Sequence, residues 1–424
     1  MRLTPSLSQP FLHAGAAPRG AMQDRVSAEG FVTLTLFTCL VLQRFAIPVG
    51  DLAISVATPI LLGAAAWGLG AGWLVIDRRR MALFLGLIAV AALSTILRLA
   101  LPVGIAPRTS LSSLLHWLVL SSFAALAFRE TMPERHFFRM VNNWLAFIAI
   151  AGIAQFILQF AGLSIFGFTG LMPERLLLEH LYVTDQVLAW GATLKRANGF
   201  FLLEPSIFAQ FMAVALMIEA LWFRRPLWLG LFAAGMLVSV SGTGFLVLAG
   251  FGVALAIGAG LRGVAMVVLM AMGAALALGL ASLAVPDVAE TLLLRSGEFS
   301  QPGTSGHERF VTPFMMMRDV FDAAPWAAFA GIGPGTAEFL ELPYKYWVNT
   351  PAKLVTEYGL VGFGLYLALI ISARRSAGQR ILVLPVLVLL LLTGGYHQAA
   401  PLLFPMLLLI TVARLEEPPP GRRA

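Results

Sequence analysis

The sequence predicts an all-α polytopic membrane protein with about twelve transmembrane helices. Hydrophobic residues make up 59% of the 424 residues, charged residues only 12%, and the mean hydropathy is +0.84. These values fall outside the range of soluble domains. The apolar residues are gathered into segments of about 20 residues, the length of one helical crossing of a bilayer. Arginines fall into alternate loops between these segments, so the chain is expected to cross a membrane many times.

These apolar segments give the expected crossings to within a few residues. In chain order they are 30–49, 52–76, 81–101, 110–128, 138–162, 205–223, 226–240, 243–259, 263–285, 351–372, 380–395 and 398–414. The stretch 238–244 (VSVSGTG) leaves open a tight outer turn or a broken helix. Residues 1–29 carry arginines but no apolar signal region, and with residues 415–424 they are expected to form cytoplasmic tails.

The arginine-rich loops orient the chain, because basic residues in short loops favour the cytoplasmic side. These loops contain Arg78, Arg79, Arg80, Arg129, Arg135, Arg139, Arg224, Arg225, Arg374, Arg375 and Arg380. Both termini are then cytoplasmic, and two longer segments face the outer side. One, at 163–204, lies within the first nine crossings at 30–285. The other is a large loop at 286–350, which precedes the last three crossings at 351–414.

Basic residues are frequent in and next to the two outer segments. They are Lys195, Arg196, Arg295, Arg309, Arg318, Lys345 and Lys353, which include every lysine of the chain. Such cations favour an anionic partner, either lipid headgroups or a phosphate-bearing substrate. The net charge of +7 would suggest nucleic acid in a soluble protein. Here it reports arginines at the membrane surface, so no nucleic-acid partner is expected.

Residues 308–324 of the large loop predict an amphipathic helix at the membrane interface. The residues of its expected apolar face are Phe310, Phe314, Met317 and Phe321. An uninterrupted helix would place Arg309 and Arg318 on opposite sides of this face, unless Pro313 breaks it. Arg309, which is close to His307 in the chain, is the better candidate for ligand binding.

Two other motifs of the large loop have simpler explanations. Asp319 and Asp322 lie on the polar face of the predicted helix, so solvation explains them better than a metal pair. The turn 331–335 (GIGPG) could aim backbone N–H groups at an anion, although its spacing favours a connection to the next crossing. Neither nucleotide-binding fingerprint applies, since no strand precedes the turn and no lysine and serine pair follows it.

The crossing after the large loop begins with Asn349, Thr350 and Pro351, a helix cap followed by a proline in the first turn. Lys353 and Glu357 stand four residues apart near its outer end, at a depth where ionisable groups are paired or functional. The spacing favours an ion pair, and a catalytic role stays open.

A similar arrangement precedes the crossing that begins at Pro205. Arg196 lies near the N-terminus of this helix, which attracts anions, and Glu204 directly precedes the proline. Snorkelling is the alternative explanation for Arg196. Gln155 and Gln159, one turn apart in the fifth crossing, are expected to hydrogen-bond to another helix.

An arginine, a glycine and a proline occur in residues 196–211 (RANGFFLLEPSIFAQF), where the first outer segment leads into the next crossing. This segment resembles a signature of the bacterial O-antigen ligase and O-antigen polymerase superfamily. Residues 309–362 resemble its large periplasmic loop and the following crossing, through the turn at 331–335 and the motif at 357–359 (EYG). The turn at 239–243 resembles a serine-rich turn of the polymerase branch. The resemblance covers roughly residues 195–372 and agrees with the expected crossings.

The resemblance implies a metal-independent glycosyltransferase of the bacterial inner membrane that needs no cofactor. Its donor would be a glycan on a polyprenyl (undecaprenyl) diphosphate carrier at the periplasmic face. Guanidinium groups would bind the diphosphate and stabilise the charge of this leaving group. The candidates for diphosphate binding are Arg196 and Arg309, followed by Arg295. The candidates for the general base that takes the acceptor's proton are Glu357, His307 and Glu204.

One departure from the superfamily favours its polymerase branch. Ligases carry a histidine just before the tenth crossing, where this chain has Trp347, Val348 and Asn349. A polymerase would join lipid-linked repeat units into O-antigen, capsule or exopolysaccharide, with a chain-length regulator as a candidate partner. A ligase for another acceptor stays open. A flippase or secondary transporter is the alternative of another class, but transporters place polar residues near the bilayer midplane, and here they gather at one face.

Overall fold

The computed structural model describes residues 19–49, 52–128, 133–178, 182, 184–188, 193–284, 300–372 and 377–392. Among these, four helices are long and apolar enough to cross a membrane, namely Arg78–Ala100, Glu134–Ala161, Pro205–Phe223 and Thr350–Ser372. Shorter apolar helices accompany them. The candidate Arg295, the crossing at 398–414 and the tails at 1–18 and 415–424 lie outside the described residues.

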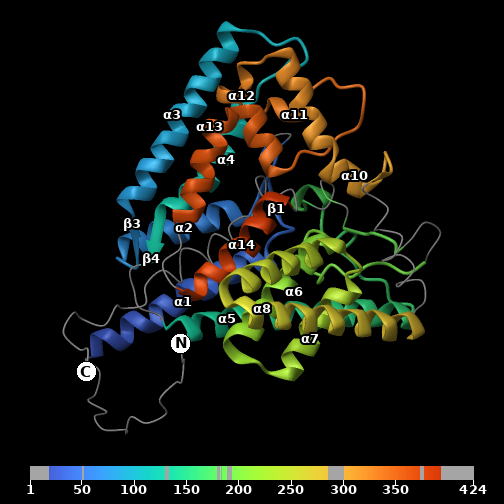
Figure 1. Ribbon diagram of the computed structural model, residues 1–424. Coiled ribbons are helices and arrows are strands. Elements are labelled where there is room, and N and C mark those ends of the chain that lie inside the picture. Colours follow the sequence, from blue (N-terminus) through green and yellow to red (C-terminus); the bar gives the residue numbers. More distant parts are fainter. Residues whose placement is uncertain are drawn as a thin grey trace.

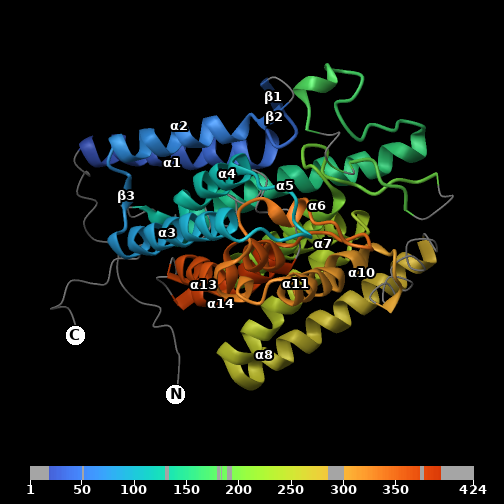
Figure 2. The same ribbon diagram turned by 90° about the horizontal axis from the view of Figure 1, so that it is seen from above.

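Helices dominate the described chain (Figure 1). The longer ones are α1 (Arg19–Val41), α2 (Ala57–Gly70), α3 (Arg78–Ala100), α4 (Leu111–Ser122), α5 (Glu134–Leu158), α6 (Pro205–Ile218), α7 (Pro226–Val238), α8 (Gly242–Ala284), α13 (Thr350–Ser372) and α14 (Ala377–Leu392). The large loop adds α10 (Ser305–Phe310), α11 (Thr312–Ala323) and α12 (Ala327–Ala330). Figure 2 shows α1 and α2 together along one edge of the bundle and α8 along the opposite edge.

Every expected crossing up to 380–395 contains a helix, but several helices are shorter than their apolar segment. Residues 46–49 form a strand, β1 (Ala46–Val49), because Pro48 cannot continue a helix; β1 pairs with β2 (Leu52–Ser55). Likewise β3 (Leu74–Ile76) pairs with β4 (Leu126–Phe128). The number of membrane crossings stays a prediction.

The structure shows how the chain passes between the expected crossings at 226–240, 243–259 and 263–285. The stretch 238–244 forms a tight turn, since α7 ends at Val238 and α8 begins at Gly242. Helix α8 runs through two expected crossings and breaks at Gly260, whose φ of 56° and ψ of −136° are not helical. Glycine takes such a φ without steric cost, so it marks the boundary between the two apolar segments.

The main hydrophobic core is centred on α6, whose Phe208, Phe211 and Met212 are fully buried. A Cβ atom at Gly152 of α5 would overlap the ring of Phe208, so the absence of a side chain lets the two helices approach closely. In a bilayer the lipid tails are as apolar as these side chains, so their burial stabilises the fold through van der Waals packing. The core therefore fixes α6, and with it the outer segment that leads into this helix.

The expected amphipathic helix at 308–324 is divided in two, which is the alternative that Pro313 left open. Helix α10 ends at Phe310 and α11 begins at Thr312, because Pro313 belongs in a first helical turn and cannot continue the preceding one. The buried residues of α11 include Pro313 and Met316, whereas Phe314 is 60% exposed. An exposed phenylalanine agrees with the expectation of an apolar face at the membrane interface.

Helix α3 runs from one end of the molecule, beside β3, to the end that carries the large loop (Figure 1). It begins beside β3 at Arg78, and the chain that follows its last turn contacts the large loop: the Glu341 N–H donates to the Ile105 carbonyl at 3.0 Å. The Ser110 N–H likewise donates to the Pro334 carbonyl at 2.9 Å. The large loop and the arginine-rich turn at 78–80 thus lie at opposite ends of α3.

Candidate active site

The first outer segment is fastened to the helices by a buried arginine, Arg44. Its guanidinium donates from Nε to the Leu202 carbonyl at 2.8 Å and from Nη1 to the Phe166 carbonyl at 2.9 Å. A buried guanidinium needs such partners, since an unpaired one would lose its hydration without compensation. Sequence analysis missed Arg44, although an arginine inside an apolar segment is itself a signal.

Asn198 joins the same segment to α5. Its Nδ2 donates to the carbonyl oxygens of Phe166 (3.0 Å) and Thr184 (2.8 Å), while its Oδ1 accepts from Gln155 Nε2 at 3.0 Å. Gln159 accepts from the Lys195 N–H at 2.7 Å. The expectation that these glutamines bond to another helix is wrong. They bind the backbone and one side chain of the outer segment, whose irregular chain exposes unpaired groups that a helix lacks.

Arg196 is held within its own segment. Its Nη1 donates to Gln186 Oε1 at 3.1 Å, and its Nη2 donates to the Leu188 carbonyl at 3.0 Å. These contacts orient the guanidinium, and diphosphate binding by Arg196 stays a prediction.

Glu204 and Arg309 bring the two outer segments together. Glu204 directly precedes Pro205, the first residue of α6, so its carboxylate lies at a helix N-terminus that favours negative charge. Its Oε2 accepts from Ser206 Oγ at 2.8 Å and lies 3.9 Å from Arg309 Nη2. The two side chains are 10% and 21% exposed. Two residues that sequence analysis proposed separately thus form one ion pair.

Arg309 is also connected to the start of α13. Its guanidinium lies over the ring of Trp347, 5.6 Å from the centroid, and its carbonyl accepts from Asn349 Nδ2 at 3.3 Å. The Oδ1 of Asn349 caps α13 by accepting from the Ala352 N–H at 3.0 Å. The C-terminal end of α10 and the N-terminal ends of α6 and α13 therefore lie next to one another around Arg309.

Tyr182 is a further polar group near this pair. Burial, together with the negative charge of Glu204, raises the pKa of its phenol to about 12. The hydroxyl is therefore protonated at neutral pH and can donate a hydrogen bond. Sequence analysis did not identify Tyr182, because one tyrosine in an irregular segment has no periodic pattern.

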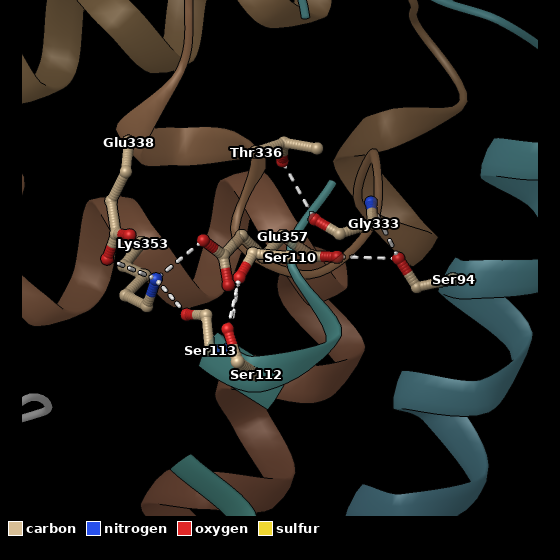
Figure 3. Close-up of polar contacts among 9 residues, drawn as sticks. All are labelled: Ser94, Ser110, Ser112, Ser113, Gly333, Thr336, Glu338, Lys353 and Glu357. Atoms are coloured by element: carbon tan, nitrogen blue, oxygen red, sulfur yellow. Dashed lines mark hydrogen bonds and ion pairs between the residues drawn. The ribbon is translucent and has the colours of Figure 1, made fainter. Parts of the chain in front are cut away.

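Glu357 lies in a separate polar cluster around Lys353 (Figure 3). Lys353 Nζ donates to Glu357 Oε1 at 2.7 Å, Glu338 Oε1 at 3.0 Å and Ser113 Oγ at 3.2 Å. Lys353 and Glu357 are fully buried. The expected ion pair is present, and it encloses the carboxylate of Glu357 away from solvent.

The glycine-rich turn at 331–335 packs against the backbone of α13 beside this cluster. Ile332 donates its N–H to the Thr356 carbonyl at 2.8 Å, and Gly333 donates its N–H to the Glu357 carbonyl at 3.2 Å. Helix α13 breaks at Gly359, whose φ is 69°, so carbonyls in the preceding turn lack helical partners. The amides of Ile332 and Gly333 therefore complete a helix, as expected for a connecting turn.

Among the described hydrogen bonds and ion pairs, none connects His307 with the carboxylate of Glu204 or Glu357. His307 lies two residues before Arg309 on α10, a rotation of about 200° around the helix axis. Its Nδ1 is shielded and has no hydrogen-bond partner among the described residues. A role for His307 as general base stays a prediction.

The two aspartates of α11 have ordinary partners. Asp319 Oδ2 accepts from the Tyr344 hydroxyl at 2.6 Å, and Asp322 forms an exposed pair with Arg318 at 3.6 Å. Burial and the hydrogen bond to Asp319 raise the pKa of Tyr344. Within the described ranges, histidine, cysteine and acidic residues do not gather in a group of three or more that would hold a metal ion.

The described helices include some that can cross a bilayer, and ionisable residues gather where the two outer segments meet. This combination is typical of a membrane protein with a polar functional site. The family model of WcaD colanic acid polymerase matches residues 31–333, and the chain belongs to this family. The expected polymerase branch is confirmed. The protein is a membrane polysaccharide repeat-unit polymerase, a glycosyltransferase-type enzyme that acts on a lipid-linked glycan. Neither the curated proteins nor the solved structures give a match.

The match includes Glu204, His307 and Arg309 and ends before Trp347 and Glu357. Both members of the ion pair between the outer segments thus lie in the part of the chain that defines the family. The cluster around Lys353 lies largely beyond it.

Proposed function

We propose that this protein elongates a polysaccharide at the periplasmic face of the bacterial inner membrane. It transfers a glycan from an undecaprenyl-diphosphate carrier to a hydroxyl group of a lipid-linked repeat unit. The ion pair of Glu204 and Arg309 carries this proposal, because it places a proton acceptor beside an anion-binding group where the two outer segments meet.

The reaction assigns one role to each residue. The acceptor oxygen attacks the anomeric carbon of the donor glycan, and the bond from that carbon to the diphosphate oxygen breaks. Glu204 takes the proton of the acceptor hydroxyl, and the polyprenyl diphosphate leaves with the bonding electrons. Arg309 stabilises the negative charge that develops on the diphosphate.

The distance between the two side chains suits this division of roles. At 3.9 Å, the guanidinium and the carboxylate attract each other without a direct hydrogen bond, so the N–H donors of Arg309 can turn to a phosphate oxygen. Trp347 limits this movement by contacting the guanidinium face. Arg196 and Arg295 are the further proposed cations for the diphosphate, and they make a metal ion unnecessary.

Glu204 is the preferred base among the three candidates. Glu357 is fully buried and bound to Lys353, so an acceptor hydroxyl does not reach it in this arrangement. His307 has no described contact with Arg309 or with either carboxylate. Of the three candidates, Glu204 is the one with a described contact to Arg309, at the junction of the two outer segments.

The test compares Arg309→Ala with Arg318→Ala in membranes supplied with lipid-linked repeat units. Arg318 is a matched control, because it lies in the same loop and its only described ion pair is the exposed one with Asp322. We expect Arg309→Ala to lower polymerisation about 10²- to 10³-fold, with Arg318→Ala close to wild type. Polymer length distributions measure the outcome. Normal lengths with Arg309→Ala would refute the proposal, and product attached to a different acceptor would indicate a ligase.

A further inference from the structure

A second cationic site lies at the end of α5 away from the candidate active site. Three guanidinium groups converge on the ring of Phe223. The Cζ atoms of Arg135, Arg139 and Arg225 lie 5.7, 5.9 and 4.9 Å from its centroid. Because α5 begins at Glu134 and its last turns bind the first outer segment, about 35 Å of helix separates the two sites.

One of these arginines is already neutralised. Arg225 donates from Nε to Glu219 Oε1 at 2.9 Å and from Nη2 to Glu219 Oε2 at 2.7 Å, and Asn142 supports the same carboxylate. Both oxygens of this carboxylate bind Arg225, and Glu219 is fully buried, so other cations do not reach it. Arg225 therefore contributes structure, and its charge is not available to another anion.

The neighbouring arginines retain their charge. Arg135, Arg139 and Arg224 are exposed and form no ion pair in the described part of the chain. Two other carboxylates lie nearby. Glu134 accepts a hydrogen bond from Trp222, and Glu29 lies 3.0 Å from His136 Nε2 in the first turn of α5. With Arg225 balanced by Glu219, the three exposed arginines face these two carboxylates, which leaves one positive charge in excess before His136 is counted. The guanidinium groups of Arg135 and Arg139, which share the ring of Phe223, repel each other, so an anion beside them would stabilise the arrangement.

The surroundings of these charges suit a lipid. Leu227, in the first turn of α7, is 86% exposed beside Arg224, and Trp228 lies 3.9 Å from the Cζ of Arg225. Exposed leucine with tryptophan and arginine is typical of the depth at which headgroups meet acyl chains. A soluble phosphate would use the arginines but would leave the leucine in water.

We propose that Arg135, Arg139 and Arg224 bind the phosphate of an anionic phospholipid, with its acyl chains along the exposed start of α7. The phosphate replaces the missing counterion of the arginines, and the acyl chains cover Leu227. This site is independent of the proposed transferase chemistry, because it shares no residue with it.

The test measures binding of phosphatidylglycerol to the purified full-length protein in neutral detergent by native mass spectrometry, with phosphatidylcholine as the neutral lipid. Arg135→Gln/Arg139→Gln is compared with Arg108→Gln/Arg175→Gln. The second pair removes two charges that are also exposed and lie in the outer-side part of the molecule. We expect the first variant to bind phosphatidylglycerol roughly thirtyfold more weakly and the control to bind it like wild type.

Three outcomes would overturn the proposal. One is unchanged lipid binding by Arg135→Gln/Arg139→Gln, and another is an equal loss in both double variants, which would indicate only a general effect of net charge. The third is binding of glycerophosphoglycerol, which lacks acyl chains, as tightly as the lipid, because the ligand would then be a soluble phosphate. Arg135→Lys/Arg139→Lys, which keeps the charges, excludes misfolding if it restores most of the binding.

Discussion

The ion pair of Glu204 with Arg309 and the cluster around Lys353 have similar chemistry but different environments. In the first, charges from two outer segments approach to 3.9 Å and stay partly exposed. In the second, Lys353 and Glu357 are fully buried, and the ammonium has three hydrogen-bond partners. Charged residues whose contacts with each other are long and incomplete can exchange partners with a substrate. A fully buried ammonium with three hydrogen-bond acceptors holds the fold together.

The strongest test of this comparison is Glu204→Gln, which keeps the shape of the side chain but removes its ability to accept a proton. We expect polymerisation to fall about 10²- to 10⁴-fold, while thermal stability stays close to wild type. The rate of polymer formation at saturating repeat unit, together with an unfolding curve in detergent, measures both effects. Loss of stability in parallel with activity would place Glu204 with the structural residues.

Lys353→Met should act in the opposite way. It leaves the buried carboxylate of Glu357 without its cation and should lower the free energy of unfolding by about 3–5 kcal/mol. Denaturant unfolding of the detergent-solubilised protein measures it, and Lys345→Met is the control, since Lys345 forms an exposed pair with Glu308. Replacing both charges, as in Lys353→Met/Glu357→Leu, should recover much of the loss. A stable Lys353→Met protein would break the comparison.

Gly331→Ala should also lower the free energy of unfolding, by less than Lys353→Met. A methyl group at Gly331 would overlap the backbone of Glu357 and Tyr358, and its φ of 73° is unfavourable for alanine. We expect a loss of about 3 kcal/mol. Gly303→Ala, at a φ of 83° with open space around it, isolates the conformational cost and should lose only about 1–2 kcal/mol. Equal losses would show that the contact with α13 is unimportant.

Apolar length predicted the helices well, because a bilayer imposes the same requirement on every crossing. A local residue overrode the pattern in two places. Pro48 turned the end of the first apolar segment into a strand, and Pro313 divided the helix at 308–324, the alternative that the sequence left open. Both prolines are visible in the sequence, but the residues that α11 buries depend on packing against α13.

The sequence identified the individual residues of the candidate site, but it did not predict which of them contact each other. Arg309 was proposed from its place beside His307, and Glu204 from its position directly before Pro205. Contacts between these distant segments depend on how both segments fold. The residues that fold them, Arg44 and Asn198, act through backbone carbonyls of irregular chain. Such bonds follow no sequence period, and this is why Arg44 escaped notice and the bonds of Gln155 were assigned to the wrong partner.

The break in α13 at Gly359 has a mechanical consequence. Before it, the residues are buried and fastened to the glycine-rich turn, whereas directly after it Leu360 and Val361 are exposed. Helix α12 packs directly against the break, since a Cβ atom at Gly359 would overlap the backbone of Phe329. Changes in bilayer thickness tilt the lipid-facing part of a helix. Such a tilt of α13 would therefore act first on its contact with α12 and the large loop.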